Sequence, residues 1–310
     1  MNRQDRTPLL IVASLVLLLG LGLLFPNWQF LGTLAIGKGL TVLGLLLLLR
    51  TGLVSFGQGL YYCLGAYAAG TLSQFTGVTD VLVLLLTAAA ASGVAAVILG
   101  ILLAAYRGIF FSMLSLALSM ILYGLLVKTA ALGSTDGFNL AVPTLLGLPL
   151  ASYESRYPLF SLACVVAALA ALAMHYYFRT PLGRLSPAIR DNEIRVEYLG
   201  ASVRAAVHVK YTIAGVLAGI GGALTGLTVG HIDPEMAYWT TSGEFVFVAI
   251  LSGTGSVAAP FLGSFIFELV RTFAYEYSPN SWQLALGTVM LLIIVFLPAG
   301  LWSLMQRRRA

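Results

Sequence analysis

The sequence carries very little charge for its length. Only 9% of its 310 residues are Asp, Glu, Lys or Arg, whereas a soluble domain carries about 25%. Hydrophobic residues make up 59% of the chain, and the mean hydropathy is +0.94. Runs such as Val81–Ala105 exceed the roughly 20 residues that cross a bilayer as a helix, without the alternation of a β-barrel. We therefore expect an all-α integral membrane protein.

Residues suited to catalysis or metal binding are scarce as well. Cys63 and Cys164 lie inside apolar runs, so we interpret both as buried hydrophobic residues rather than a disulfide or a metal site. The sequence contains neither the G-x-S-x-G motif of serine hydrolases nor the H-E-x-x-H motif of zinc proteases. His231 and Asp233 can form a dyad, but a solvated outer loop is the simpler interpretation. An intramembrane enzyme is therefore the least favoured function, and no metal is expected.

Hydrophobic segments separated by Gly, Pro, Asn and Asp predict about ten spanning helices in a single domain, residues 1–310. One segment, Ala237–Tyr275, is long enough to cross twice or to enter and return, with a turn at Gly253–Ser256. The other segments are Leu9–Phe25, Phe30–Leu49, Leu53–Leu72, Val81–Ala105, Ile109–Leu132, Leu159–Phe178, His208–Val229 and Trp282–Met305.

The positions of Lys and Arg predict the orientation, because basic loops stay in the cytoplasm. Arg3, Arg6 and Arg307–Arg309 place both termini there, and the loops assigned to the outside are mostly acidic. The net charge of +5 therefore follows membrane topology and does not indicate nucleic-acid binding.

The segment from Arg179 to Lys210 is the one sizeable polar island, and its basic excess predicts a cytoplasmic loop, residues 179–207. Ser186-Pro187 is typical of a helix start. Asp191 or Asn192 can cap a second helix over Glu193–Leu199. Helices this short persist mainly when they pack against something. A docking element and an ordinary solvated loop both fit this pattern.

Small and polar residues mark further candidate sites inside apolar segments. Arg50–Gly59 is a glycine-broken stretch, which either lines a cavity or forms a plain turn. A serine stripe either joins helices or lines a pathway. A ridge of small residues predicts close helix packing. The serines are Ser112, Ser115 and Ser119, and the ridge is Ala218, Gly222, Gly226 and Gly230. Gly253 and Gly255, in the late turn, are expected to serve helix packing as well.

Three charged residues fall within or near apolar segments. Lys38 lies in the second segment, and we expect it to reach the membrane surface from near a helix end. Glu268 and Arg271 are three residues apart and can pair on one helix face.

Several segments resemble, in order, the signatures of one transporter family. They are TGLVSFGQGLYYCLGAYAAG (51–70), STDGFNLAVP (134–143), GRLSPAIRDNEIRVEYLG (183–200), GTGSVAAPFLGSFIFE (253–268) and LPAGLW (297–302). They are similar to the permease subunits of bacterial ABC importers for branched-chain amino acids, the M-type (LivM-like) subunit in particular. Gln58 departs from the pattern, since family members often have histidine there.

The resemblance implies a permease fold like that of type II ABC importers, in the bacterial cytoplasmic (inner) membrane. It also implies a homologous second permease in a heterodimer, two cytoplasmic ATPase subunits and an external substrate-binding protein. The chain has no G-x-x-x-x-G-K-[ST] loop, so ATP and Mg²⁺ are expected on the ATPase subunits and no cofactor on this chain. The residues implied to couple with the ATPases are Arg184, Ile189, Arg190, Asp191, Asn192, Glu193, Ile194, Glu197, Leu199 and Gly200.

The expected cargo is a branched-chain amino acid or a related small solute, such as an amide, urea or an aromatic acid. Ser55 and Gln58 offer hydrogen bonds beside flexible glycines. A stand-alone transporter or channel is the alternative, but it would carry several paired charges within the membrane, and the sequence has few. The candidate pathway residues are Ser55, Gly57, Gln58, Gly59, Ser112, Ser115 and Asp136.

Overall fold

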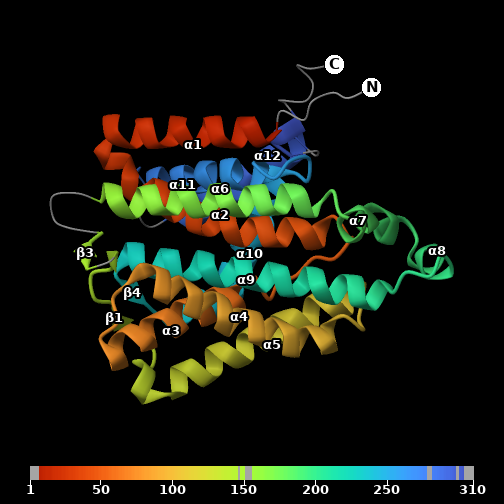
Figure 1. Cartoon of the computed structure of the whole chain (residues 1–310), viewed down its shortest axis with the longest axis horizontal. Helices are drawn as coiled ribbons and strands as arrows, with labels where there is room; N and C mark the ends of the chain where they lie inside the picture. The colour runs from red at the N-terminus through yellow and green to blue at the C-terminus, as the bar shows by residue number, and fades with distance from the viewer. Residues whose placement is uncertain (1–6, 146, 151–155, 278–280, 298–299, 304–310) are drawn as a thin grey trace.

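The computed structural model describes residues 7–145, 147–150, 156–277, 281–297 and 300–303. Long helices run side by side along the molecule, with short strands at one end and the helices α7 and α8 at the other (Figure 1). The helices are α1 Thr7–Leu24, α2 Gln29–Leu49, α3 Gln58–Thr76, α4 Val81–Leu103, α5 Gly108–Lys128, α6 Tyr157–Tyr177, α7 Pro181–Asp191, α8 Glu193–Tyr198, α9 Val203–Val229, α10 Trp239–Ser252, α11 Ala259–Tyr277 and α12 Trp282–Phe296.

The connections at the strand end contain short regular elements. Strands β1 and β4 pair antiparallel, with Phe138 opposite Ile232 and Asn139 opposite His231. Strands β2 and β3 form a second antiparallel pair. The bounds are β1 Phe138–Asn139, β2 Thr144–Leu145, β3 Leu148–Pro149 and β4 His231–Ile232, with 3-10 turns η1 Pro26–Trp28, η2 Ala130–Leu132 and η3 Pro234–Ala237.

Helix α9 lies at the centre of the bundle and packs against α2, α3 and α4. Small residues permit this close approach, as the ridge in the sequence predicts. A methyl group on Gly222 would overlap the carbonyl oxygen of Tyr62, and one on Gly226 would lie 2.9 Å from Ile232. Gly230 ends α9 in a left-handed conformation with φ +76°, and Gly253 ends α10 with φ +77°. The described structure places Gly255 exposed in the turn that follows α10.

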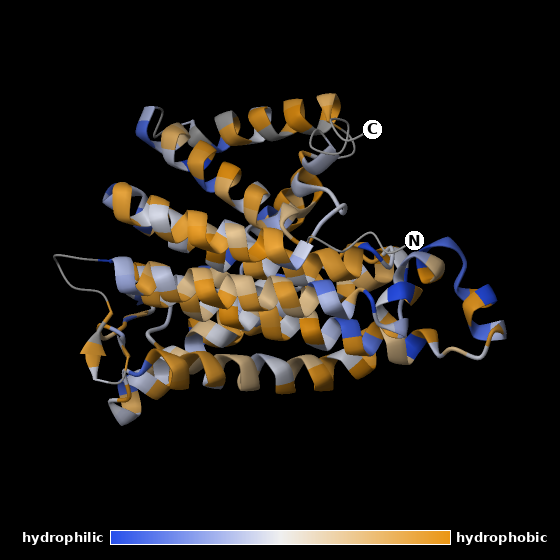
Figure 2. Ribbon diagram, turned by 45° about the horizontal axis from the view of Figure 1, so that its top comes forward, coloured by the Kyte–Doolittle hydropathy of each residue, from blue (hydrophilic) through white to orange (hydrophobic). Residues whose placement is uncertain are grey.

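Six helical segments are long and apolar enough to cross a membrane. They are α1, Pro26–Leu49 (η1 with α2), α4, α5, α6 and α9. Hydrophobic residues dominate the long helices, whereas hydrophilic residues gather on the segment that protrudes at one end (Figure 2). An all-helical membrane protein is therefore confirmed. The expectation of about ten spans and of two cytoplasmic termini stays a prediction; Arg3, Arg6 and Arg307–Arg309 lie outside the described residues.

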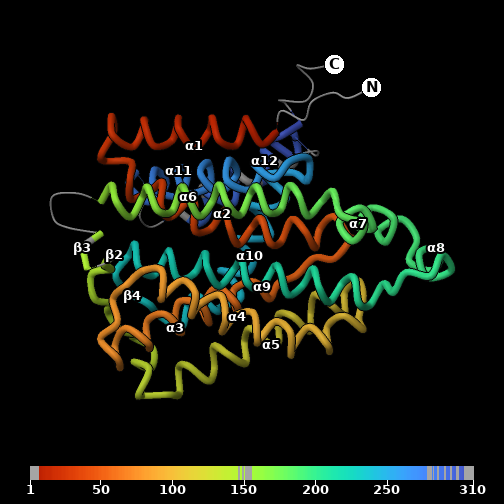
Figure 3. The backbone as a smooth tube through the Cα atoms, in the orientation of Figure 1, coloured from red at the N-terminus to blue at the C-terminus, as the bar shows by residue number. Residues whose placement is uncertain are grey.

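Three expected segments differ from the structure. The span Trp282–Met305 is a shorter helix than expected, because α12 ends at Phe296 with Leu297 as its C-cap. The span Leu53–Leu72 does not begin as a helix, because residues 53–57 form a non-helical connection before α3 (Figure 3). The segment Ala237–Tyr275 does divide into two arms, α10 and α11, at the expected glycine turn. However, α10 has 14 residues, about 21 Å of helix, and is shorter than a hydrocarbon core of about 30 Å.

Candidate functional site

The protruding end of the molecule is formed by α7 and α8. Helix α7 begins at Pro181, and the Thr180 side chain caps it by accepting a hydrogen bond from the Gly183 amide at 3.2 Å. The helix start predicted at Ser186-Pro187 was wrong: Pro187 lies inside α7 and Ser186 is buried. Thr180-Pro181 supplies the same cap-and-proline pattern one and a half turns earlier.

Helix α8 has the boundaries that the sequence suggests. The Asn192 side chain accepts a hydrogen bond from the Arg195 amide at 3.0 Å, and Gly200 follows with φ +86°. Val196 is buried against the chain, whereas Ile194, Tyr198 and Leu199 are 66%, 88% and 82% exposed. Helix α8 therefore presents an apolar surface, here called the α8 face, formed by Ile194, Tyr198 and Leu199.

An ion pair joins α8 to the connection between α4 and α5. The Arg107 Nε lies 2.7 Å and 2.8 Å from the two carboxylate oxygens of Glu193. Both side chains are about one-third exposed, so the pair orients α8 more than it stabilises the fold. Glu193, expected to contact a partner, is thus already engaged within the chain.

The polar island is shorter than predicted. The segment 179–207 was expected to be a loop, but α9 begins at Val203, and Val203 and Val207 are buried. Lys210 is fully buried in α9, and its ammonium makes no hydrogen bond among the described residues. Apolar residues at every third or fourth position from 203 draw this part of the chain into the core. Of the other predicted coupling residues, Ile189 is buried, and Arg184, Arg190, Asp191, Asn192, Glu197 and Gly200 are exposed.

Arg50 connects three elements near the base of α7. Its Nη2 donates to the Thr254 carbonyl at 2.7 Å, which ties the end of α2 to the turn between α10 and α11. Its guanidinium lies 3.9 Å from the centre of the Phe178 ring, just after α6. Burial lowers the pKa of the Arg50 guanidinium from its usual value, because desolvation disfavours the charged form. The end of the bundle that carries α7 and α8 is therefore cross-linked through one side chain.

The predicted pathway serines bind the connection before α3. The Ser112 hydroxyl donates to the Val54 carbonyl at 2.7 Å, and the Ser115 hydroxyl accepts from the Phe56 amide at 3.1 Å. Ser119 donates to the Ala237 carbonyl at 2.7 Å. These bonds satisfy non-helical backbone inside the bundle, as membrane proteins require. The serine stripe therefore anchors α5 to these connections.

The remaining pathway candidates are divided between the core and the surface. Ser55, Gly57, Gln58 and Gly59 are buried, and neither amide atom of Gln58 has a hydrogen-bond partner among the described residues. Asp136 is exposed at the strand end. His231, which the sequence suggested as a partner of Asp233, has its Nδ1 2.8 Å from the Asn139 side-chain oxygen. None of the predicted pathway residues lines the cavity described next, so their role in transport stays a prediction.

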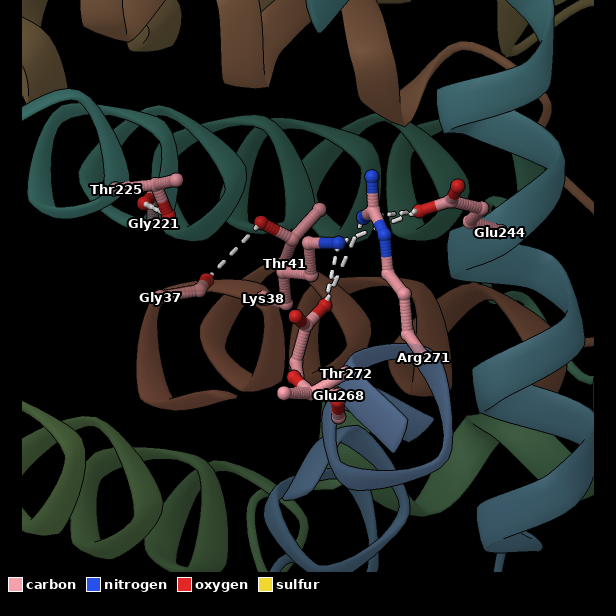
Figure 4. Close-up of polar contacts among 9 residues, drawn as sticks. All are labelled: Gly37, Lys38, Thr41, Gly221, Thr225, Glu244, Glu268, Arg271 and Thr272. Carbon is pink, nitrogen blue, oxygen red and sulfur yellow. Dashed lines mark hydrogen bonds and ion pairs between the residues drawn. The ribbon is translucent and has the colours of Figure 1, made fainter. Parts of the chain in front are cut away.

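A cluster of four charged side chains lies inside the bundle. Lys38 is near the middle of α2, and its Nζ lies 2.5 Å from Glu268 Oε1 on α11 and 3.3 Å from Glu244 Oε2 on α10. Arg271 Nη1 lies 3.4 Å from the same Glu244 oxygen and 3.9 Å from Glu268 Oε1. Figure 4 shows the four side chains converging from these helices. Lys38, Glu244, Glu268 and Arg271 are called the charged cluster below.

The charged cluster borders a cavity of about 480 Å³. Its outer part is formed near η3, at the strand end of the bundle, and includes Asp233 and Glu235. Its walls also carry apolar and aromatic groups, so the lining is of mixed polarity. The other lining residues are Leu34, Tyr62, Thr225, Val229, Met236, Thr241, Thr272 and Tyr275.

The charged cluster corrects one expectation and confirms another. Lys38 does not reach the membrane surface: its side chain is 9% exposed and lies between two carboxylates. Glu268 and Arg271 do contact each other, as their spacing predicts. Glu244 was not singled out. The sequence did hold a signal for Glu244. Charges at membrane depth pair with one another, and Lys38 in one apolar segment had no partner there, whereas the segment Ala237–Tyr275 contains two glutamates.

Comparisons with known proteins cover most of the chain. A family model described as the permease component of branched-chain amino acid transport systems matches residues 29–295. The high-affinity branched-chain amino acid transport system permease protein LivM of Escherichia coli (strain K12) is 28% identical over 276 residues, covering 81% of this chain and 64% of that protein. The corresponding permease protein BraD of Pseudomonas aeruginosa is 25% identical over 265 residues, covering 81% of this chain and 86% of BraD.

A second type of permease matches less of the chain. The permease protein LivH of Escherichia coli (strain K12) is 22% identical over 139 residues, which cover 44% of this chain and 45% of LivH. The chain spans 64% of the length of LivM. No solved structure matches the chain.

Proposed function

The chain belongs to the family of permease components of branched-chain amino acid transport systems, and we propose that it is the membrane subunit of an ATP-driven importer. In this proposal α7 and α8 dock on cytoplasmic ATPase subunits. The membrane helices then alternate between states open to either side as the ATPases close and separate. ATP and Mg²⁺ are bound by the ATPases and not by this chain.

The α8 face is the observation that carries this proposal. Ile194 and Tyr198 on the six-residue helix α8, and Leu199 at its C-cap, are all more than 60% exposed where this segment projects from the bundle. Water does not favour such a surface, and a short helix gains its stability from packing. A cleft on a partner would bury the α8 face while the Arg107–Glu193 ion pair transmits its movement to α4 and α5.

The membrane topology and the partners follow from the same proposal. Helix α1 begins on the side of the molecule where α7 and α8 lie (Figure 1), which supports a cytoplasmic N-terminus if that side is cytoplasmic. The match to LivH as well as to LivM supports a homologous second permease beside this chain. An external binding protein would deliver the cargo to the strand end, where Asp136 is exposed. We place the complex in the bacterial inner membrane.

Co-purification tests the docking role directly. The chain is expressed with the ATPases encoded beside it, and the complex is isolated in mild detergent. We expect Leu199→Glu to lose the ATPases and to abolish ATP-dependent uptake, because a charge replaces a buried contact. Leu148→Glu is the matched control for co-purification alone, since Leu148 is 73% exposed at the opposite end, away from α8. Retention of the ATPases and full uptake by Leu199→Glu would overturn the docking role.

A stand-alone transporter is the second candidate, and the charged cluster favours it. The sequence suggested too few paired charges for such a protein, but the structure brings four of them together. Charges of this kind occur in ion-coupled pathways. Reconstituted vesicles separate the two candidates: uptake by the purified chain alone, abolished by a protonophore, would support the second candidate and exclude the first.

A further inference from the structure

A second cavity, of about 350 Å³, lies at the strand end of the bundle. Its residues come from the start of α2, the start of α6, the end of α9 and the connection after β1 (Figure 1). Backbone hydrogen bonds fix that connection: the Leu140 amide donates to the Gly230 carbonyl at 2.9 Å, and the Leu150 amide donates to the Pro143 carbonyl at 2.8 Å. The fold therefore builds this cavity. Val229 is the one described residue that also lines the cavity beside the charged cluster.

Arg156 gives the second cavity a single sign of charge. It is the only ionisable side chain among the described residues of the lining, and no described carboxylate is paired with it. Its guanidinium lies 4.8 Å from the centre of the Phe30 ring on α2. Stacking on a ring leaves the edge of a guanidinium, with its N–H donors, available to an anion. The second cavity therefore favours an anion, whereas the first carries four carboxylates as well as its two cations.

The rest of the lining favours an anion with an apolar part. Leu159 and Leu227 are each 3% exposed, and Val142 and Val229 are 54% and 50% exposed. A small hydrophilic anion would lose hydration beside these side chains and gain no contact in return. An amphiphilic anion would instead remove apolar surface from water on both partners.

Aromatic residues place the second cavity at the level of the lipid head groups. Trp28 lies in η1 just before α2 and is 45% exposed, and Tyr157 follows Arg156 as the first residue of α6. Trp and Tyr gather where the hydrocarbon of a membrane meets its head groups. Both α6 and the segment that contains η1 and α2 are long and apolar enough to cross the membrane. Arg156 is therefore within reach of the phosphates of one leaflet, and basic pockets between spanning helices suit anionic head groups.

We propose that the second cavity binds an anionic phospholipid from the leaflet at the strand end. The lipid phosphate accepts hydrogen bonds from Arg156, and the glycerol and the first acyl methylenes pack against Leu159, Leu227 and Val142. A phosphatidylcholine fits less well, because its own cation would lie near the guanidinium. The bound lipid contacts α2, α6 and α9 together and so stabilises this end of the bundle. The proposal requires a membrane protein and is independent of the importer function.

Native mass spectrometry of the full chain in detergent tests the ligand class. The chain is titrated with phosphatidylglycerol and with a phosphatidylcholine that has the same acyl chains. We expect phosphatidylglycerol to bind at least about fivefold more tightly, because only this lipid carries a net negative charge. Inorganic phosphate and hexanoate, each at the concentration of the lipid, should not displace it. Equal binding of the two lipids would overturn the proposal, and displacement by either soluble anion would assign the cavity to such an anion instead.

Variants of Arg156 test the cationic group. Arg156→Gln should lower the affinity for phosphatidylglycerol about fivefold and leave phosphatidylcholine unchanged. Arg156→Lys keeps the charge and should recover most of the loss. Lys128→Gln is the matched control, because Lys128 is an exposed cation at the end of α5, at the same end of the bundle, and does not line the cavity. Unchanged affinity in Arg156→Gln, or an equal loss in Lys128→Gln, would contradict the proposed site.

A variant that leaves Arg156 in place separates lipid binding from a structural role of the arginine. Val142 lines the same cavity and is 54% exposed, so the fold should tolerate a polar side chain there, as size-exclusion chromatography will show. Val142→Glu should weaken phosphatidylglycerol binding about fivefold, because it adds a negative charge beside the phosphate, whereas Val142→Gln should bind more tightly than Val142→Glu. Phosphatidylglycerol should also raise the apparent Tm of Val142→Gln more than that of Val142→Glu. Equal affinities and equal rises in the two variants would overturn the proposal.

Discussion

Lys38 compensates two carboxylates from different helices at once. Its Nζ lies 2.5 Å from Glu268 and 3.3 Å from Glu244, so it links α2 to both arms of the α10–α11 hairpin. Removing one partner of a buried pair leaves an uncompensated charge, which costs more than the pair itself contributes.

We therefore expect Lys38→Met to destabilise the protein by about 3–5 kcal/mol. Lys38→Met combined with Glu268→Met should recover part of that loss, because the second change removes the unpaired carboxylate. Apparent Tm values in one detergent would show the order wild type, double variant, single variant. A double variant no more stable than the single variant would contradict this account of the cluster.

Gly222 is a residue at which packing forbids even a methyl group. Its added Cβ would overlap the Tyr62 carbonyl oxygen, which is fixed by helix α3 and has no flexible end to move. We expect Gly222→Ala to destabilise the protein by about 1–3 kcal/mol through overpacking. Gly124→Ala is the control, since no atom lies within 4 Å of its added Cβ on α5. It should be neutral or slightly stabilising. Thermal unfolding measures both, and equal Tm values would refute the steric explanation.

Elements α7 and α8 show what local sequence can predict. Asn192 and Gly200 bound α8 because capping chemistry and a left-handed glycine act within one turn of the chain. Ser186-Pro187 has the same capping chemistry, but the prediction of a helix start there was wrong. The helix already begins at Thr180-Pro181, and Ser186 is buried inside it. Two adjacent start signals compete, and only tertiary packing decides between them.

The attachment of α8 depends on a contact distant in sequence. We expect Arg107→Gln to loosen α8, because Glu193 then loses its partner at 2.7 Å, although a pair that is about one-third exposed contributes at most about 1 kcal/mol to global stability. Hydrogen–deuterium exchange of residues 193–199 should rise while the Tm stays nearly constant. Arg195→Gln serves as control, since Arg195 is exposed on α8 itself. Unchanged exchange in Arg107→Gln would show that α8 is held otherwise.

At the scale of the whole molecule, the sequence predicts the helices better than their partners. Hydropathy located the long apolar helices, and small residues on α9 indicated close packing. It did not reveal that α2, α10 and α11 meet at Lys38, or that the serines of α5 hold the connection before α3. Such contacts join residues up to 230 positions apart, as between Lys38 and Glu268. The periodicity of hydrophobic residues within one segment therefore cannot predict them.

The orientation of the bundle is the last prediction. Asp136 lies exposed at the strand end and Glu197 on α8 at the opposite end (Figure 1). Residues 179–204, which carry α7 and α8, hold five arginines against three acidic residues, and such basic segments stay in the cytoplasm. In intact cells, a membrane-impermeant maleimide should label Asp136→Cys, and should label Glu197→Cys only after permeabilisation. The unsubstituted chain is the control, because Cys63 and Cys164 are buried and should remain unlabelled. The reverse pattern would invert the topology and place α8 beyond the reach of cytoplasmic ATPases, so the docking role would fail with it.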